Sequence, residues 1–383
     1  MLYLAKSLQN LGFRAILPAL EALGATRLPL VAANAALLHR SIKPYPRRAF
    51  EIAGTTEEIV AARPFVELRR FVPITGPRGP RVLLVAPLSG HHATLVRDTI
   101  ASLVADHDVY VTDWRDARDV PLAEGTFSLD DYIAEVRGFL ALLGAESTHV
   151  VAVCQPTVPV LAAVALDAAA GRPAPRTLAL IGGPIDARMS PTQVNKFATT
   201  HSISWFEHAL TYRVPPGYRG VGRKVYPGFL QLTAFLMMNP ERHFKAHMEY
   251  WTAQLTGKSP EVIAAHEAFY DEYNAVLDMD ARYYLDTVRL VFQEFALARG
   301  TWRVGGELVE PAAIRTTALF TIEGELDDIS GPGQTEAAHA LTPNASRHEH
   351  LVARGVGHYG LFSGRRWRGE IYPALRAFIE SNA

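Results

Sequence analysis

The sequence predicts an α/β protein with a mostly parallel sheet, helices on both faces of the sheet and a helical cap insertion. Short apolar runs of strand length alternate with stretches of helical periodicity, which is typical of a parallel sheet covered on both sides. The alternation stops between about residues 187 and 313, where aromatic, His and Met residues are frequent and the pattern is helical. A hydrophobic content of 49% and a charged content of 20% are ordinary for a folded chain of 383 residues.

The apolar runs give the strands in chain order. Seven segments are predicted as strands: Phe65–Val72, Arg81–Ala86, Asp108–Thr112, Thr148–Val153, Thr177–Ile181, Ala318–Glu323 and His348–Val352. Between them, helical periodicity is clear over Leu129–Leu143 and Val158–Ala170. The resulting division is an N-terminal helical segment (1–50), a first core part (51–186), the cap (187–313) and a second core part (314–383).

The N-terminal segment has apolar residues at helical spacing. These are Leu4, Leu8, Leu11, Phe13, Ile16, Leu17, Leu20 and Leu23. Two interpretations stay open: a helix packed on the core, or an amphipathic contact with a lipid-like or polymer surface. The segment lacks the continuous apolar region of a signal peptide, and no run of about 18 apolar residues predicts a transmembrane helix.

Charge and cysteine content narrow the function classes. The net charge is −1 with balanced signs, so no basic footprint for nucleic acid is expected. The single cysteine, Cys154, cannot form an internal disulfide, which fits a reducing compartment such as the cytoplasm. The oligomeric state is not determined by the sequence, and a homodimer stays open.

Cys154 stands where a strand is predicted to turn into a helix. Residues 152–156 read AVCQP, which corresponds to the G-x-S-x-G elbow that exposes a nucleophile in α/β-hydrolases. Ala and Pro replace the two glycines, and Pro is tolerated in the first turn of a helix. The alternative is a structural cysteine in the core.

Residues farther along the chain supply partners for a nucleophile. Asp327 and Asp328 follow the predicted strand ALFTIE, and His358 follows the last strand. The order nucleophile, acid, histidine is that of α/β-hydrolases, in which the acid orients the imidazole. Taken singly, the acids could be turn residues and the histidine a loop residue.

The oxyanion donors are expected at two places. One is the backbone N–H of Gln155, and the other is that of Leu88 or Ser89, in the loop after the strand RVLLVA, where Gly90 allows close approach. Ser89 with His91 or His92 is a rival pair. No metal-binding spacing such as H-E-x-x-H appears, so neither a metal nor another cofactor is expected.

Together these motifs resemble the intracellular poly(3-hydroxybutyrate) depolymerases, which are similar to α/β-hydrolases but use Cys in place of Ser. The resemblance runs through PLSGHHATLVRDT, VCQPTVPVLAA, EGELDDIS and GVGHYGLFSGRRW. It implies hydrolysis of ester bonds in short-chain polyhydroxyalkanoate, with a thioester on Cys154, His358 as base and acid, and Asp327 as its orienter; Asp328 is the fallback. It also implies a polyester granule or its oligomers as substrate, and a cytoplasmic location that extends to the granule surface.

Aromatic residues of the cap are candidates for an apolar acyl channel, or else for the packing of the cap itself. They are Trp205, Phe206, Tyr226, Phe229, Phe235 and Trp251.

Three other functions stay open. A polyhydroxyalkanoate synthase has a similar fold and triad, but its elbow usually keeps the glycines and its acid is usually followed by histidine, where this chain has Pro156 and Asp328. A small-substrate esterase or thioesterase on the same scaffold is the second. A granule-binding protein without turnover is the third.

Overall fold

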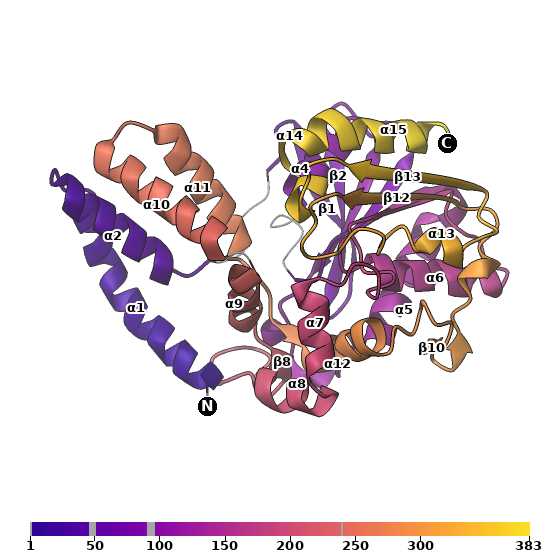
Figure 1. Ribbon diagram of the computed structural model, residues 1–383, viewed down its shortest axis with the longest axis horizontal. Coiled ribbons are helices and arrows are strands. Elements are labelled where there is room, and N and C mark those ends of the chain that lie inside the picture. Colours follow the sequence, from indigo (N-terminus) through magenta and orange to yellow (C-terminus); the bar gives the residue numbers. More distant parts are fainter. Residues whose placement is uncertain (1, 46–50, 90–95, 239) are drawn as a thin grey trace.

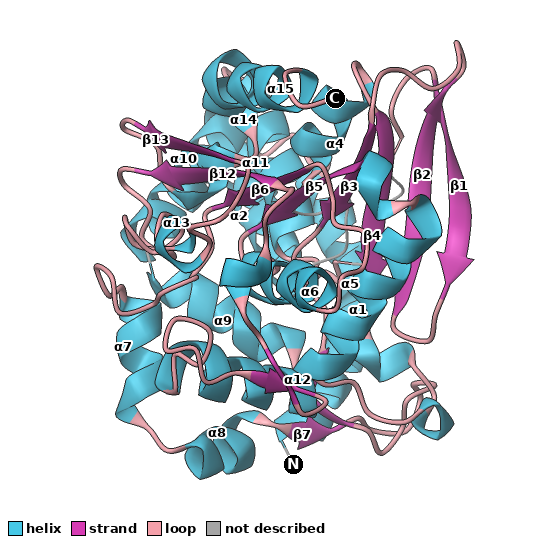
Figure 2. Ribbon diagram, turned by 90° about the vertical axis from the view of Figure 1, so that its right-hand side faces the viewer, coloured by secondary structure: helices cyan, strands magenta, loops and turns pink. Residues whose placement is uncertain are grey.

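The computed structural model describes residues 2–45, 51–89, 96–238 and 240–383. Within these ranges an eight-stranded sheet has the order β1-β2-β4-β3-β5-β6-β12-β13. Strands from β4 to β13 along this order run parallel, whereas β2 is antiparallel to both of its neighbours. Figure 2 shows β1 at one edge and β13 at the other. The strands are β1 (Thr55–Ala62), β2 (Val66–Pro73), β3 (Arg81–Val85), β4 (Asp108–Trp114), β5 (Thr148–Val153), β6 (Thr177–Ile181), β12 (Ala318–Gly324) and β13 (Arg347–Ala353).

Helices cover the sheet on both faces because its central strands are apolar on both sides. In β3, Leu83 and Val85 pack in one buried cluster with helices α5 and α6, while Val82 and Leu84 pack in a second with α4 and α15. This alternation is the period of two that a strand imposes on its side chains. The helices of the core are α4 (Arg97–Val104), α5 (Leu129–Leu143), α6 (Thr157–Ala169), α13 (Ala338–Leu341), α14 (Gly364–Arg366) and α15 (Tyr372–Glu380).

The seven predicted strands are confirmed, as are the two predicted helices, with ends that agree within one or two residues. Strand β1 was not predicted. Most of its residues are exposed, so it has no buried face and leaves no hydrophobic alternation in the sequence.

The region between β6 and β12 is mostly helical, but it also contains short strands that the sequence pattern did not indicate. Its helices are α7 (Gln193–Thr200), α8 (Ile203–Leu210), α9 (Gly228–Met238), α10 (Pro240–Thr256), α11 (Pro260–Tyr273) and α12 (Ala281–Asp286). A three-stranded sheet joins β7 (Tyr212–Arg213), β8 (Lys224–Tyr226) and β9 (Met279–Asp280), and β10 (Arg303–Val304) pairs with β11 (Glu307–Leu308). Strands of two or three residues are too short to show a period.

A buried arginine fixes this region to the core. Arg223, which is 1% exposed, donates to Asp280 Oδ2 at 2.9 Å. Its other hydrogen bonds go to the backbone carbonyls of Val120 (3.1 Å), Pro121 (2.7 Å) and Gly125 (2.6 Å). Every acceptor therefore compensates the cost of burying the guanidinium.

Four helices extend from the rest of the molecule and are called the arm here: α1 (Leu2–Gly24), α2 (Pro29–Ile42), α10 and α11 (Figure 1). Helix α1 packs on α2, and α2 packs on α10. At the start of α1, Tyr3 is buried in the core cluster and donates a hydrogen bond to Asp278. The first helix is thus anchored at one end, while most of its length lies on α2. Within the described residues, no helix combines the length and apolar character that crossing a membrane needs.

Candidate active site

Cys154 lies between the end of β5 and the start of α6, at the carboxyl edge of the parallel strands. Its φ of +65° is in the left-handed region, which is uncommon for a residue with a side chain. Its N–H donates to Ile181 O at 2.7 Å, and its carbonyl accepts from the backbone N (3.1 Å) and the hydroxyl (2.8 Å) of Thr157. These bonds hold the strained turn, so the half-buried side chain projects from the sheet edge.

Two glycines after β6 let the backbone approach the turn. A Cβ on Gly183 would lie 1.7 Å from Thr157 Oγ1, and a Cβ on Gly182 would lie 3.4 Å from both Asp327 Oδ2 and His358 Cε1. Gly182 also has a φ of +57°. The sequence GG after the strand is therefore required by space and by conformation.

Asp327 lies in the turn after β12 and is buried. Its Oδ1 accepts from the backbone N–H groups of Ile329 (2.9 Å) and Ser330 (2.8 Å), which leaves Oδ2 facing His358. The neighbouring Asp328 is exposed and makes no such contact with His358. The structure thus separates the two acids by position: the first faces the imidazole and the second faces outward.

His358 begins the short helix η6 (His358–Leu361) and is 3% exposed. Its Nδ1 lies 2.8 Å from Asp327 Oδ2, and Cys154 lies near enough for its charge to act on the imidazole. Burial alone would lower the pKa of His358, but the charges of Asp327 and Cys154 and the hydrogen bond to Asp327 outweigh it, so the pKa lies well above its usual range. Such an environment favours the charged imidazolium form of His358.

The oxyanion candidates lie at the same sheet edge. Gln155 precedes α6, where a backbone N–H has no acceptor within the helix. Leu88 and Ser89 follow β3, and the carbonyl of Ser89 accepts from Leu277 N (3.2 Å) and Gln231 Nε2 (2.8 Å). Gly90, His91 and His92 lie outside the described residues, and so does the rival Ser–His pair that depends on them.

The six aromatic residues predicted to form an acyl channel lie in different surroundings. Phe206 is 1% exposed, and Tyr226 stacks on Tyr284 with ring centroids 4.0 Å apart. Phe229 packs against Tyr3. Among the rest, Trp205 stacks on His201, Trp251 donates to Asn34 on α2, and Phe235 lines a cavity. Of these six, only Phe235 borders one of the two cavities described next.

Two cavities border the His358 loop on the side of α11. The larger, of about 240 Å³, is lined by residues that include Phe269, Tyr273 and Tyr359; the smaller, of about 20 Å³, shares these three and adds Phe235 and Asp328. The rings of Tyr359 and Tyr273 are in contact with centroids 5.8 Å apart, and the pKa of Tyr359 is raised by burial first and then by that neighbouring phenol. The sequence reasoning missed this pair, although Tyr359 sits beside His358 in the GHYG motif.

Tyr283 is a second residue that the sequence reasoning missed. It is fully buried in α12 and stacks with Phe127 and Tyr132. Burial, and to a smaller extent the charge of Cys154, raises its pKa. Only the packing of α12 on the core brings this ring near the turn, and no motif around it signals that position.

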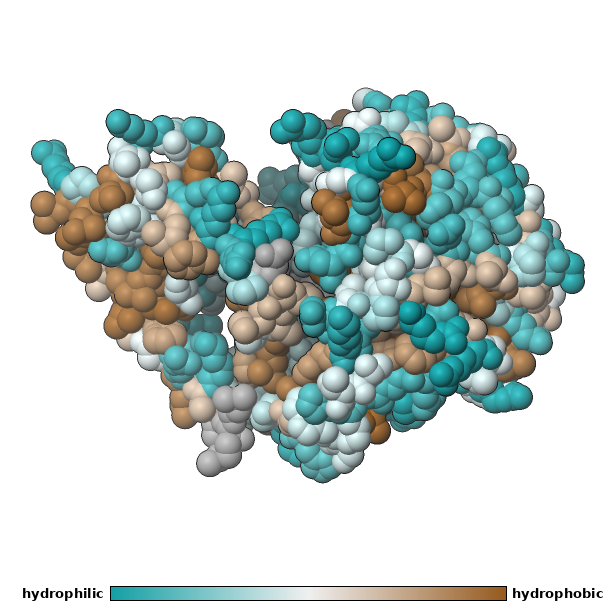
Figure 3. Space-filling view, in the orientation of Figure 1, coloured by the Kyte–Doolittle hydropathy of each residue, from teal (hydrophilic) through white to brown (hydrophobic). Residues whose placement is uncertain are grey.

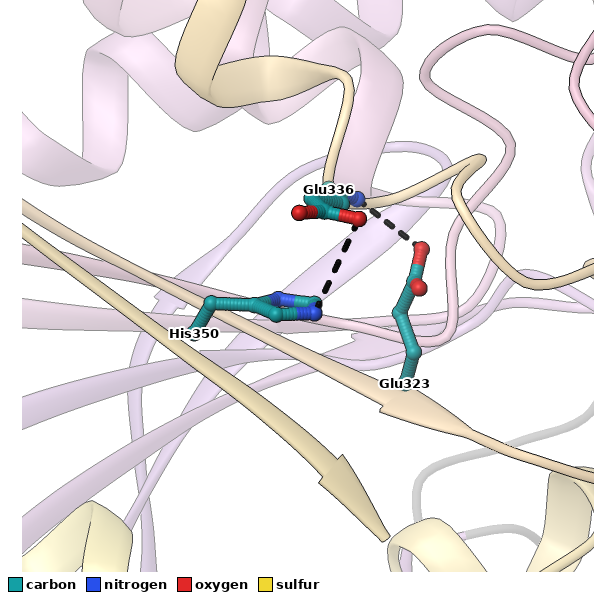
Figure 4. A group of neighbouring side chains, drawn as sticks. All are labelled: Glu323, Glu336 and His350. Atoms are coloured by element: carbon teal, nitrogen blue, oxygen red, sulfur yellow. Dashed lines mark hydrogen bonds and ion pairs between the residues drawn. The ribbon is translucent and has the colours of Figure 1, made fainter.

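One cluster outside this site has three potential metal ligands: Glu323, Glu336 and His350 (Figure 4). Glu323 is buried, and its carboxylate accepts from the backbone N–H groups of Gly333 (2.8 Å), Thr335 (2.6 Å) and Glu336 (2.9 Å). His350 Nε2 lies 3.8 Å from Glu336 Oε2. These three backbone hydrogen bonds satisfy the buried carboxylate of Glu323, which thereby stabilises the backbone of residues 333–336.

Comparison with known proteins adds the family. The model of the PHB de-polymerase C-terminus family matches residues 182–383, which is more than half of the chain and includes both Asp327 and His358. The chain belongs to this family. It is therefore a carboxylic ester hydrolase with an α/β-hydrolase fold. No curated protein has a significant match to the sequence.

Solved structures similar to this fold have low sequence identity. An esterase from Thermogutta terrifontis is 16% identical with a TM-score of 0.46, covering 86% of this chain and 99% of its own. A putative lipase from Acinetobacter baumannii is 13% identical with a TM-score of 0.47, and the match covers 86% of this chain and 94% of the lipase. A putative non-heme bromoperoxidase from Mycobacterium tuberculosis is 12% identical with a TM-score of 0.48, and the match covers 88% of this chain and 99% of the bromoperoxidase. At these scores the likenesses carry no argument about function.

Proposed function

We propose that this hydrolase cleaves ester bonds of a short-chain polyhydroxyalkanoate, such as poly(3-hydroxybutyrate), through a thioester on Cys154. The observation that carries the proposal is the placement of Cys154 and Asp327 about the His358 imidazole, in which the histidine–aspartate bond measures 2.8 Å. The order and roles of the three groups match those of a nucleophile–base–acid triad.

The first half of the reaction forms the thioester. The Cys154 thiolate attacks the ester carbonyl carbon, and the charge that develops on the carbonyl oxygen is stabilised by the backbone N–H of Gln155 and that of Leu88 or Ser89. The tetrahedral intermediate collapses, the C–O bond breaks, and the alcohol leaves with the proton carried by His358. Asp327 orients the imidazole and stabilises its charged form.

The second half releases the acid. A water molecule gives a proton to His358 as its oxygen attacks the thioester carbonyl, and the C–S bond then breaks. The product is a 3-hydroxy acid or a shorter oligomer, and the thiolate–imidazolium pair is regenerated. Neither half of this proposed reaction uses a cofactor.

We also propose that residues 187–313 act as the cap over this site and that the enzyme works in the cytoplasm at the surface of polyester granules. The cap aromatics would then divide into packing residues such as Phe206 and residues near the substrate such as Phe235. The apolar lining around Tyr273 and Tyr359 suits an acyl chain that carries few polar groups.

The test is product analysis with amorphous poly(3-hydroxybutyrate) granules. Wild type should release 3-hydroxybutyrate or its short oligomers, and Cys154→Ala should release none above background. Alkylation by iodoacetamide should inactivate with one modified site, since Cys154 is the single cysteine. Unchanged hydrolysis by Cys154→Ala would show that the nucleophile is another group.

The same material separates the rival functions. Polymer growth and CoA release from 3-hydroxybutyryl-CoA would indicate a synthase instead. Turnover of soluble nitrophenyl esters without any release from granules would indicate a small-substrate esterase. Granule binding with no soluble product from either substrate would indicate a binding protein.

A further inference from the structure

The outer surface of the arm carries a row of exposed apolar side chains, called the outer face here. Each is between 36% and 63% exposed. The row consists of Leu8, Ile16 and Leu23 on α1, Leu28 in the turn, and Leu30, Val31 and Leu38 on α2. Figure 3 shows hydrophobic surface gathered along this side of the arm.

On α1 the outer face is continuous and uncharged. At 100° per residue, Leu8, Ile16 and Leu23 fall within an arc of about 80°, and the helix spans about 27 Å between residues 5 and 23. The small residues in the same arc are also exposed; they are Ala5, Gly12 and Ala19. The charged residues of the helix lie outside the arc; they are Lys6, Arg14 and Glu21.

The core does not cover this face. The buried side of α1, with Tyr3 and Leu20, is turned toward the core and α2. Monomeric proteins rarely expose a contiguous apolar surface of this extent without a partner. The helix therefore has a second apolar side that intramolecular packing leaves open.

The surface leads toward the cavities beside the candidate site. Helix α2 packs on α10, and Trp251 of α10 donates to Asn34 of α2. Further exposed apolar side chains follow on the helices next to it: Phe244 at 68%, Met248 at 38% and Phe269 at 37%. Phe269 lines both cavities that border Tyr359. Apolar surface is thus found from the outer face to the His358 loop.

We infer that the outer face of α1 and α2 is the surface that seats this enzyme on an uncharged polyester particle. The inference rests on the proposed function, because a polymer particle cannot enter a cavity of about 240 Å³ and must be met at its surface. A polyester offers aliphatic groups and ester oxygens but no charge and no donors, which matches a face without charged side chains. The exposed apolar side chains on α10 and α11, with Phe269 lining both cavities, favour this occupant over a second copy, because a dimer contact would not require apolar residues beside the candidate site.

The test compares two triple variants of the full chain. The first is Leu8→Gln, Ile16→Gln and Leu23→Gln on the outer face. The matched control is Ile74→Gln, Leu122→Gln and Leu142→Gln, which changes apolar residues of similar or higher exposure elsewhere on the molecule. Both are made also with Cys154→Ala, so that binding to amorphous poly(3-hydroxybutyrate) granules is measured by co-sedimentation without consumption of the polymer.

The outer-face variant should lose at least about tenfold in granule affinity, because three apolar contacts are removed. Its kcat/KM for a soluble nitrophenyl ester should stay within about twofold of wild type, because the altered residues lie on α1 of the arm and not at the sheet edge that carries the triad. The control should bind as wild type does.

Three results would overturn the inference. The first is granule binding by the outer-face variant that equals that of wild type. Sedimentation could show a wild-type dimer that the variant dissociates while granule binding persists, which would assign the face to a second copy. Equal affinity of wild type for phosphatidylcholine vesicles and granules would assign it to a lipid surface. Failure of the proposed function is seen separately, as absence of any hydroxy acid released by wild type.

Discussion

Replacement of Asp327 by Asn tests the orienting acid with little change in shape. The amide oxygen of Asn can still accept from the N–H groups of Ile329 and Ser330, which Asp327 Oδ1 holds at 2.9 and 2.8 Å. The other side, however, presents an NH₂ group to His358 Nδ1 in place of the carboxylate oxygen at 2.8 Å. The imidazole then loses both its partner charge and the tautomer in which Nδ1 carries the proton.

The magnitude follows from burial. Both groups are nearly inaccessible to solvent, and removing one partner of a buried pair costs about 3–5 kcal/mol. At 1.36 kcal/mol per tenfold, this corresponds to a fall in kcat of about 10²- to 10⁴-fold if the whole cost falls on the transition state.

The pH profile gives a second readout. The charge of Asp327 opposes the effect of burial and raises the pKa of His358. Without it, that pKa should fall, and the basic limb of kcat/KM, where the imidazolium loses its proton, should move to lower pH. The assay is hydrolysis of a soluble nitrophenyl ester between pH 5 and 10, with background hydrolysis subtracted.

Asp328→Asn is the matched control because it makes the same change one residue away on an exposed side chain. It should keep the wild-type kcat and the wild-type basic limb. A larger loss in Asp328→Asn than in Asp327→Asn, or a basic limb that stays in place in Asp327→Asn, would refute the assignment.

Three further predictions concern packing and protonation. Gly183→Ala should destabilise the fold by about 1–3 kcal/mol and reduce activity, because its Cβ would lie 1.7 Å from Thr157 Oγ1; urea unfolding and ester hydrolysis measure the two effects. Arg223→Met should cost about 3–5 kcal/mol in the free energy of unfolding, since it leaves Asp280 buried without its partner. Burial lowers the pKa of His266 to about 3, so an unfolded arm takes up a proton that the folded arm excludes; arm stability should be lost as pH falls from about 6.5 toward 3, which hydrogen exchange in α10 and α11 detects.

Each of these has its own check. Gly138→Ala, in α5 with no atom within 4 Å of the added Cβ, should instead stabilise by about 0.5–1 kcal/mol. Lys224→Met removes an exposed ion pair beside Arg223 and should leave the unfolding midpoint nearly unchanged. Protection of α10 and α11 that is equal at pH 7 and pH 5 after correction for intrinsic exchange would contradict the role given to His266.

Short-range patterns in the sequence were enough to predict the core of this protein. The central strands are buried on both faces, so their hydrophobic runs are continuous and their ends are readable. The order of Cys154, Asp327 and His358 also follows from the chain, because each comes after a predicted strand of the parallel part of the sheet, and parallel strands end at one edge. What the chain order could not give is which acid of the Asp327–Asp328 pair faces the imidazole. That depends on the turn after β12, in which the N–H groups of Ile329 and Ser330 hold Asp327 Oδ1.

Only the tertiary structure determines what surrounds Cys154, Asp327 and His358. Tyr273 and Tyr359 are 86 residues apart, as their numbers show, and meet only because α11 packs against the His358 loop. Strand β1 has no buried face, and β7 to β9 are too short for a period, so neither leaves a signal in the sequence. The N-terminal helix shows the same limit: its periodicity predicts an apolar side, but only packing decides that one side meets α2 while another remains exposed.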